Sequence, residues 1–262
     1  MNKISVAIPT FYSSEFISDC IKSLVNYTVV SEIVVCDDSE DLKEFNTLDR
    51  NIKKITKETN IDIKISKNNK NLGGFKNKYN CVEKTTNEYV YQIDSDNISN
   101  PKFLRYISNI NFETLDQSLL FLPSKIYLFN QHKYQSFIKP SNNVTYLKKT
   151  KILNALDIQK VLINNKKFVK DKNFGWLLNT GNPFFNKKSY LENLAPGLED
   201  SKNISAACSI ALVYFWLKSG NSICISEFLS HYHRVRDDSY FVSQGDTAIN
   251  SIDTFKERIK NL

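Results

Sequence analysis

The segment Asp94-Ser95-Asp96 places two carboxylates one residue apart, directly after the apolar run from Tyr89 to Ile93. A run of this length and composition predicts a buried strand, so both carboxylates would stand beside one pocket at its end. Mg²⁺ and Mn²⁺ are held in proteins by a few carboxylates together with phosphate oxygens. The triplet alone is expected by chance in a chain of this composition. Its position after a strand is what favours a site for a metal ion and a diphosphate.

Two further strand-like runs end in residues that suit a nucleotide. The run from Ile4 to Pro9 continues into Thr10, Phe11 and Tyr12, and the run from Glu32 to Cys36 continues into Asp37-Asp38-Ser39. An aspartate at a strand end can accept a hydrogen bond from a ribose hydroxyl or a base N–H, and an aromatic ring such as that of Tyr12 can stack on a base. The alternative for Asp38 is a turn, which aspartate also favours.

These strand ends meet only if their strands lie in one parallel sheet. Apolar residues recur at helical spacing over residues 17–24 and 42–55, a further helix is expected from 74 to about 85, and residues 61–65 alternate as a strand does. This alternation of strand and helix predicts an α/β fold, with a mostly parallel central sheet flanked by helices on both faces. Ligands of such sheets bind beyond the carboxyl ends of the strands.

The second half of the chain is less regular. We expect helices over residues 101–111, 152–163 and 201–218, strands over 119–122, 126–129 and 222–225, and a basic C-terminal helix from about residue 252. An aromatic, Asn-rich stretch that contains Trp176 lies between them, and this Trp could stack on a sugar face or belong to the core. No repeat or linker is visible, so the pattern indicates one domain.

Several of these segments resemble the family-2 glycosyltransferases in order and spacing. The matching segments are Val6-Ala7-Ile8-Pro9-Thr10-Phe11, Ile33 to Ser39, Asn71-Leu72-Gly73-Gly74, Glu88 to Asp96, Glu199-Asp200, and Ser230 to Ser239. The resemblance spans most of residues 3–240. It implies the GT-A, or nucleotide-diphospho-sugar transferase, fold in a single domain over 1–262. That domain would have a nucleotide-sugar-binding half (1–100), an acceptor-binding half (101–240) and a C-terminal helix (241–262).

The activity that this resemblance implies is metal-dependent, inverting and hexosyltransferase-like. A sugar would pass from a nucleoside diphosphate sugar, with a UDP-sugar as the expected donor, to an acceptor hydroxyl in surface glycan or polysaccharide synthesis. The implied donor-binding residues are Pro9, Thr10, Tyr12, Asp38, Lys78, Asp94 and Ser95. The implied ligands of Mn²⁺ or Mg²⁺ are Asp96, Asp94 and His233. Of these, Asp94 would contact ribose or a metal-bound water. His231 is the neighbour that could replace His233. The implied general base is Asp200, with Glu199 beside it.

The reaction explains these residue types. Departure of the diphosphate develops negative charge that a divalent cation stabilises. An acceptor hydroxyl reacts poorly until a carboxylate takes its proton. The alternative for Glu199 and Asp200 is capping of a helix N-terminus, and for the two histidines it is ordinary packing.

Composition excludes several other classes of protein. The chain has 262 residues and 41% hydrophobic residues, which is enough for a substantial core. No stretch reaches the roughly 18 apolar residues of a membrane span, the N-terminus does not read as a signal peptide, and five widely spaced cysteines favour a reducing compartment. We therefore expect a cytoplasmic protein. Peripheral contact with the inner face of the membrane is compatible with this location.

The net charge of +7 is concentrated in one window. Residues 125–172 contain eleven Lys, no Arg and two Asp. This window suggests an anionic partner, such as a glycan, lipid-linked or phosphate-bearing acceptor at a membrane surface. The alternative is that these lysines simply lie on solvated faces.

A basic nucleic-acid-binding module would interleave Arg with aromatic residues, so no nucleic acid is expected. A sugar nucleotidyltransferase would carry a Gly-rich basic loop after the first strand, and this sequence has no such loop there. A catalytically silent transferase is a further alternative.

Overall fold

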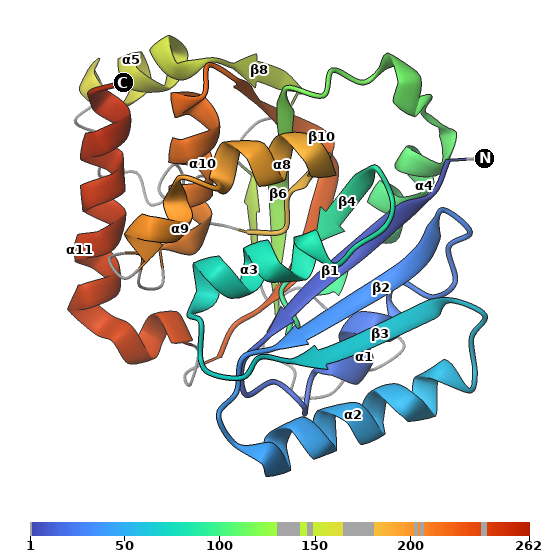
Figure 1. The fold of residues 1–262 in the computed structure, drawn as a ribbon. Coiled ribbons are helices and arrows are strands. Elements are labelled where there is room, and N and C mark those ends of the chain that lie inside the picture. Colours follow the sequence, from blue (N-terminus) through green and yellow to red (C-terminus); the bar gives the residue numbers. More distant parts are fainter. Residues whose placement is uncertain are drawn as a thin grey trace.

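The computed structural model describes residues 2–129, 142–145, 149–164, 181–201, 204, 207–236 and 240–262. In this part of the chain ten strands form one sheet in the order β3-β2-β1-β4-β9-β6-β10-β5, with β7 beside β6 and β8 beside β10. Helices cover both faces of the sheet (Figure 1). The expected α/β architecture is therefore confirmed.

The first half follows the predicted alternation of strand and helix. Strands β1, β2, β3 and β4 are parallel to one another in the sheet, so their carboxyl ends meet at one edge. The elements are β1 (Ile4–Thr10), α1 (Ile17–Lys22), β2 (Val30–Asp37), α2 (Leu42–Thr56), β3 (Asp62–Lys67), α3 (Gly74–Glu83) and β4 (Tyr89–Gln92). Successive residues of β1 point to opposite faces: Val6 and Ile8 pack with helices α1, α2 and α4, whereas Ala7 packs with α3, α8 and α10.

The second half adds strands of both directions. β10 runs parallel to β6, while β9 is antiparallel to both β4 and β6. The elements are β5 (Ile98–Ser99), α4 (Pro101–Asn109), the 3₁₀ turn η1 (Phe112–Thr114), β6 (Leu119–Phe129), β7 (Asn142–Thr145), β8 (Lys151–Leu153), α5 (Ala155–Asn164), β9 (Phe184–Asn186), α8 (Lys187–Leu194), α9 (Gly197–Asp200), α10 (Cys208–Lys218), β10 (Ser222–Arg234) and α11 (Tyr240–Lys260).

Three of the expected elements in this half have different bounds. The predicted helix over 152–163 begins with a strand instead, because Ile152 pairs with Cys224 of β10. The predicted helix over 201–218 starts at Cys208. The predicted strand over 222–225 continues to Arg234 because it finds a second set of partners in β6 and β5. In each case pairing with a distant segment overrides the local pattern.

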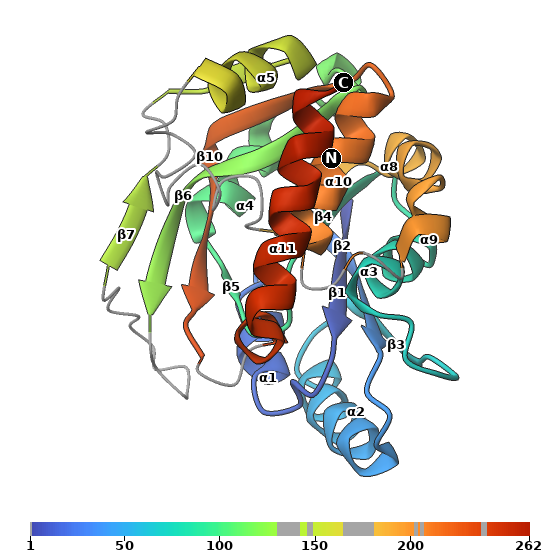
Figure 2. The same cartoon turned by 90° about the vertical axis from the view of Figure 1, so that its left-hand side faces the viewer.

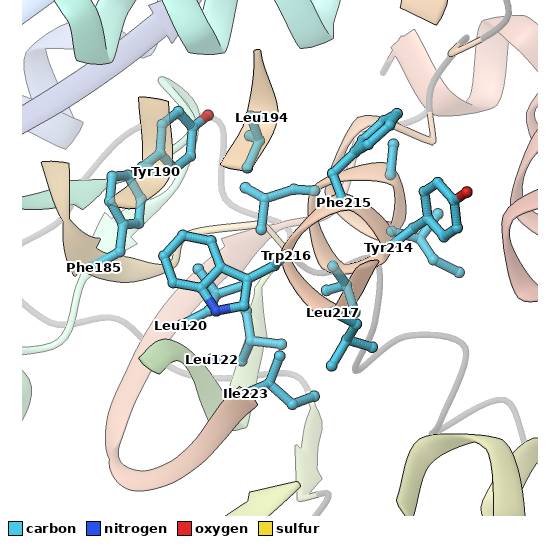
Figure 3. Close-up of a cluster of buried hydrophobic side chains, with 14 of the residues drawn as sticks. Leu120, Leu122, Phe185, Tyr190, Leu194, Tyr214, Phe215, Trp216, Leu217 and Ile223 are labelled. Atoms are coloured by element: carbon cyan, nitrogen blue, oxygen red, sulfur yellow. The ribbon is translucent and has the colours of Figure 1, made fainter. Parts of the chain in front are cut away.

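Helix α10 is the centre of the core on one side of the sheet (Figure 3). Every residue from Ile210 to Leu217 is buried, so the helix has no polar face of its own. Trp216 is fully buried, and its indole N–H contacts the carbonyl oxygens of Ser118 at 2.9 Å and Ser222 at 3.0 Å. The hydrogen bonds tie α10 to the starts of β6 and β10. No helix of the described residues is long and apolar enough to cross a bilayer.

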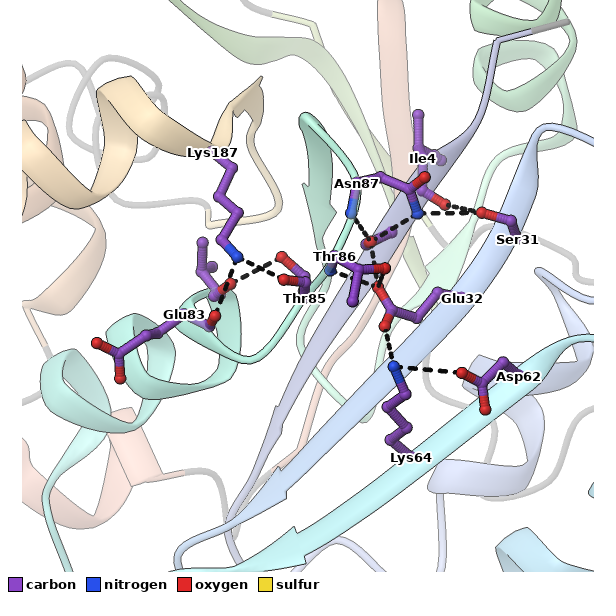
Figure 4. A network of polar contacts seen from close by, with 12 residues as sticks. Ile4, Ser31, Glu32, Asp62, Lys64, Glu83, Thr85, Thr86, Asn87 and Lys187 are labelled. Carbon is purple, nitrogen blue, oxygen red and sulfur yellow. Dashed lines mark hydrogen bonds and ion pairs between the residues drawn. The ribbon is translucent and has the colours of Figure 1, made fainter.

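A buried carboxylate joins the first strands away from the carboxyl edge (Figure 4). Glu32 in β2 is 3% exposed and accepts hydrogen bonds from Lys64 Nζ at 2.6 Å, from the Thr86 backbone N–H at 2.8 Å, and from the Ser5 hydroxyl. Burial by itself would raise the pKa of Glu32, but the hydrogen bonds from Lys64, Ser5 and Thr86 outweigh it and hold the pKa below its usual value.

We predict that Glu32→Gln lowers the free energy of unfolding by about 1–3 kcal/mol at pH 7, because a charged acceptor of several hydrogen bonds is replaced by a neutral one. The folded-state pKa of Glu32 is depressed, so its contribution is present above the unfolded pKa and is lost as the pH falls through the folded value. Urea unfolding at a series of pH values measures this. A gap between wild type and variant that stays constant down to about pH 3 would contradict the assignment.

Candidate active site

The metal motif lies at the carboxyl edge of the sheet, directly after β4. Asp94 is half-buried, and its Oδ1 lies 2.9 Å from Nζ of Lys78 in α3. Burial by itself would lower the pKa of Lys78, but Asp94 and then Cys208 raise it above its ordinary value. The Lys78 ammonium and the Asp94 carboxylate therefore form a charged pair. Ser95, between the two carboxylates, is buried.

The second carboxylate of the motif has its own cation. Oδ2 of Asp96 lies 3.4 Å from Nη1 of Arg236, which follows β10. Burial raises the pKa of Asp96 and so does Asp94, while His233 and Arg236 oppose this shift. Each carboxylate of the motif is thus compensated by a basic side chain from a different part of the chain.

Arg234 holds the backbone of the same loop. Its Nε donates to the Asp96 carbonyl oxygen at 3.1 Å, its Nη2 lies 3.1 Å from Asp19 Oδ2, and its backbone N–H donates to Asn97 Oδ1 at 3.2 Å. The guanidinium stacks at 4.7 Å from the ring centroids of Phe16 and of Phe129. Sequence reasoning did not assign a role to Arg234 or Asn97. The signal that could have found them is position, because Asn97 directly follows the metal motif and Arg234 directly follows His233.

Strand β10 brings the two histidines to this loop. His231 pairs with Ser99 and Tyr232 pairs with Ile98 of β5, which leaves the motif directly. His231 is fully buried, and His233, on the same side of the strand, is half-buried and contributes to the electrostatic environment of Asp96. Of the two histidines, His233 is thus the one that lowers the pKa of Asp96, and its role as a metal ligand stays a prediction.

Buried polar atoms without partners gather around the motif. Asn97 Nδ2, Asn182 Nδ2 and both ring nitrogens of His231 are buried and have no hydrogen-bond partner within the described ranges. Asn182 adjoins the motif because its Oδ1 accepts from the Asp94 backbone N–H at 2.8 Å. A buried donor without an acceptor costs about 1–3 kcal/mol. A concentration of such atoms in one place is typical of a site that binds a ligand, an ion or ordered water.

Tyr12 and Phe11 form an exposed aromatic pair at the end of β1. Their side chains are 44% and 37% exposed and their rings meet edge to face at 4.8 Å. Tyr12 has a φ of 48°, and its backbone N–H donates to Ser39 Oγ at 2.8 Å. Thr10 and Ser39 both donate to Asp37 Oδ1 at 2.8 Å, and Pro9 and Thr10 are buried. Sequence reasoning identified Tyr12 but missed Phe11 and the anchoring role of Asp37.

Asp38 organises the glycine turn that begins α3. Its Oδ1 accepts from Asn68 Nδ2 and from the Leu72 backbone N–H, both at 2.8 Å, and its Oδ2 accepts from the Gly73 N–H at 2.9 Å. Burial raises the pKa of Asp38, and these three hydrogen bonds partly offset it. Gly73 has a φ of 79°, which explains a glycine there. The geometry shows that Asp38 holds the backbone of this turn. Its contact with a nucleoside stays a prediction.

The acidic pair Glu199-Asp200 lies in the short helix α9. The Asp200 carboxylate bonds to Arg258 of the C-terminal helix α11.

The N-terminal end of α10, not that of α9, lies near the metal motif. A Cβ atom added at Gly181 would lie 2.9 Å from Asp94 Oδ2, 3.4 Å from Ser209 Oγ and 3.6 Å from Lys78 Nζ. Ser209 is therefore a neighbour of the motif that the sequence did not reveal, and the assignment of Asp200 as base stays a prediction.

Some sequence predictions fall outside the described residues. Trp176 and the rest of the aromatic stretch up to Thr180 are among them, as are most lysines of the basic window. The described lysines of that window include Lys149, Lys151 and Lys160, all of which are exposed.

Comparison with known proteins agrees with the geometry. The model of the family "Glycosyl transferase family 2" matches residues 5–159, which is more than half of the chain. A search of curated protein sequences found no significant match.

Among solved structures, a crystal structure of S. aureus TarS 1–349 in complex with UDP superposes with a TM-score of 0.60 at 18% identity, covering 98% of this chain and 69% of that one. The complex of TarS 1–349 with UDP-GlcNAc gives 0.62 at 16% identity, covering 99% and 67%. A further TarS crystal structure gives 0.58, and there the chain spans only 39% of the relative's length.

At these identities the likeness to TarS shows the fold, which is the GT-A fold expected from the sequence. The strand-end motifs lie at the carboxyl edge of the parallel strands of this fold, and the family model covers the same strands. The chain belongs to glycosyl transferase family 2 and is a glycosyltransferase.

Proposed function

We propose that this glycosyltransferase is metal-dependent and inverting, and that it moves a hexosyl group from a UDP-sugar to an acceptor hydroxyl. The observation that carries the proposal is the pair of carboxylates at the end of β4, each compensated by a cation, Lys78 for Asp94 and Arg236 for Asp96. A divalent cation and a diphosphate are the two ligands that such a set of charges accommodates together. The TarS structures with UDP and UDP-GlcNAc support a uridine nucleotide as the first donor to test.

The residues present fit a Mn²⁺ or Mg²⁺ ion that retains water. Within the described residues, no group of three His, Cys, Asp or Glu side chains converges as a preformed metal site. Hard divalent cations need only one or two protein carboxylates when substrate phosphates complete the shell. Asp96 and His233 would hold the ion, with Asp94 contacting ribose or a metal-bound water. When bound, the ion would supply Lewis-acid stabilisation of the leaving diphosphate.

The donor would lie along the carboxyl edge between the aromatic pair and the metal motif. Tyr12 offers an exposed ring for the base, and the buried Pro9 and Thr10 directly before it would border the nucleoside. Asp38 would act on the nucleoside through the turn that it anchors, and Lys78 and Ser95 would border the diphosphate. These roles are supported by the positions of Tyr12, Asp38 and Ser95 just after β1, β2 and β4, and by the ion pair that brings Lys78 of α3 to Asp94.

We infer that Asp200, with Glu199 beside it, is the general base that deprotonates the acceptor. Inversion requires the base on the side of the sugar opposite the diphosphate, and a carboxylate contributes about 10²–10⁴-fold in that role. The support for Asp200 is its place in the family's motif order. Its ion pair with Arg258 of α11 fixes the position of the carboxylate.

The acceptor is proposed to be a glycan that is lipid-linked or carries phosphate. The exposed Lys149, Lys151 and Lys160 belong to the lysine window, whose charge suits an anionic acceptor at the inner face of a membrane. This acceptor would place the reaction in the synthesis of a surface glycan or polysaccharide.

The first test uses the thermal stability of the purified protein with UDP and Mn²⁺. At a UDP concentration about 100 times Kd, binding adds about 2.7 kcal/mol of stability and raises Tm by several degrees. Asp96→Ala is expected to abolish this shift, whereas the exposed Asp253→Ala keeps it. Unchanged melting of the wild type with UDP, GDP, CDP, ADP and dTDP would refute the proposed donor class.

The second test separates the base from its ion pair. Asp200→Asn is expected to lower sugar transfer by about 10²–10⁴-fold while UDP affinity stays within twofold, because the base acts on the acceptor. Arg258→Gln breaks the same ion pair but keeps the carboxylate, so it retains most of the transfer. Equal losses in both variants, together with equal drops in Tm, would show that Asp200 is structural.

The third test reverses charge at the lysine window. The triple change Lys149→Glu, Lys151→Glu and Lys160→Glu is expected to raise the acceptor KM at least about tenfold, at about 1 kcal/mol per lysine near an anionic surface. Donor hydrolysis without acceptor should not change. Transfer to lipids of a membrane extract measures the first quantity and UDP release measures the second. An equal loss of both activities would show that these lysines do not act on the acceptor alone.

A further inference from the structure

Three of the most exposed large apolar side chains of the described residues lie in one short stretch of the chain. Leu156 is 63% exposed, Ile163 is 58% exposed and Ile152 is 57% exposed. Exposed apolar side chains are ordinary when they are scattered singly over a surface. These three instead belong to β8 and α5, which follow one another directly in the chain. Their concentration there points to a surface that contacts something outside the fold.

Helix α5 has two apolar faces, of which the fold uses one. Ile158 and Leu162 are buried in the core. Leu156, Lys160 and Ile163 recur at the spacing i, i+4 and i+7, so they share the opposite face of the helix. That outer face is exposed at all three positions. Packing within the described part of the chain therefore does not account for its two aliphatic side chains.

Lysines are interleaved with these aliphatic side chains. Lys149 and Lys151 lie just before and within β8, Lys160 lies on the outer face of α5, and all three are exposed. Asp157 is the one acid in the sequence from 149 to 164. Its carboxylate caps the helix, because Oδ2 accepts a hydrogen bond from the Asn154 backbone N–H at 3.1 Å. The stretch therefore combines exposed aliphatic groups with a surplus of positive charge.

This stretch lies at the end of the sheet away from the metal motif. β8 pairs with residues at the start of β10. β10 is parallel to β6, and β6 runs in the direction of β4 because β9 is antiparallel to both. β8 and α5 therefore lie toward the amino ends of the strands, at the top of Figure 1, whereas Asp94 and Asp96 follow the carboxyl end of β4. A partner bound there would leave the donor site open.

We propose that this surface, the α5–β8 face, docks the protein on an anionic lipid bilayer. The face consists of three exposed aliphatic side chains and three exposed lysines: Ile152, Leu156, Ile163, Lys149, Lys151 and Lys160. Aliphatic side chains on such a face enter the boundary between headgroups and acyl chains, while lysines beside them attract anionic headgroups. The proposal extends the proposed function, in which the acceptor lies at a membrane, but its test uses neither donor nor acceptor.

The charge of the surrounding sequence argues for lipid as the occupant. The window 125–172, to which the whole face belongs, has eleven Lys against two Asp. An anionic bilayer matches this bias over a wide area, and its headgroups attract basic residues within about a Debye length, roughly 10 Å. The acid beside the face is Glu227 of β10, which accepts a hydrogen bond from the Thr150 hydroxyl at 3.4 Å.

The test measures binding of the full chain to lipid vesicles by flotation. Wild type is expected to bind vesicles of phosphatidylglycerol and phosphatidylcholine in equal parts at least about tenfold more tightly than vesicles of phosphatidylcholine alone. The double change Leu156→Gln and Ile163→Gln is expected to weaken binding to the anionic vesicles by about 10-fold to 100-fold, because two aliphatic side chains no longer leave water. Glutamine keeps a high helix propensity, so α5 should persist.

The lysines are tested in the same assay. The triple change Lys149→Gln, Lys151→Gln and Lys160→Gln is expected to weaken binding to the anionic vesicles by about 100-fold. Binding to phosphatidylcholine alone should change by less than about threefold, because neutral vesicles offer the lysines no anionic headgroup.

Helix α2, at the opposite end of the molecule in Figure 1, supplies matched controls. Leu42→Gln removes a side chain that is 61% exposed. The triple change Lys43→Gln, Lys54→Gln and Lys57→Gln removes three positive charges from exposed positions. Both controls are expected to keep the vesicle affinity within about threefold of wild type, because charges further from the bilayer than a Debye length are screened.

A gain of binding provides a test that misfolding cannot mimic. Leu156→Trp places an aromatic ring on the outer face of α5. Because Trp favours the interface between headgroups and acyl chains, this variant is expected to bind the anionic vesicles about threefold more tightly than wild type.

Four outcomes would overturn the proposal. Wild type that stays unbound to anionic vesicles would exclude docking. Equal weakening by the two lysine triples would indicate diffuse attraction by the net charge. Unchanged binding of the Leu156→Gln and Ile163→Gln variant would exclude insertion of the face. A wild-type dimer that this variant turns into a monomer, measured by sedimentation equilibrium, would assign the face to a second copy of the chain. None of these results affects UDP binding, so they differ from a failure of the proposed function.

Discussion

Two carboxylates one residue apart on a half-buried loop repel each other, and the structure places a cation against each. Lys78 comes from the helix that follows the glycine turn, and Arg236 comes from the end of β10. Charge compensation of this kind offsets part of the cost of holding two carboxylates side by side away from bulk water. The arrangement of the remaining elements can be understood as the means of bringing these two cations to one loop.

Two sets of strand pairings achieve this. The parallel ladder of β1 with β2 and β4 aligns three strand ends, which sets the aromatic pair and the Asp38 turn beside the motif. The antiparallel pairing of β10 with β5 carries His233, Arg234 and Arg236 back to the residues that leave the motif. At the other end of β10, the indole N–H of the buried Trp216 in α10 donates to carbonyl oxygens at the starts of β6 and β10. Strand β10 is therefore held at both ends.

The sheet and its carboxyl-edge motifs were predictable because they depend on local patterns. Period-two and period-3.6 repeats of apolar residues identified β1 to β4 and the helices between them, and the glycine turn before α3 was visible as well. The second half was predicted less well. The β8 strand, the late start of α10 and the length of β10 depend on which distant segments pair with them, and no repeat within the segment encodes that choice.

The same distinction applies to the site. By itself the sequence determined which residue types stand at the strand ends, because strand, turn and carboxylate are neighbours in the chain. Only the tertiary structure decided which cations face them. Arg236 is 140 residues from Asp96, and Asp200 pairs with Arg258 from another helix. Such contacts are decided by sheet register and helix packing, since a charge is compensated by whatever the fold brings within a few ångströms, at any separation along the chain.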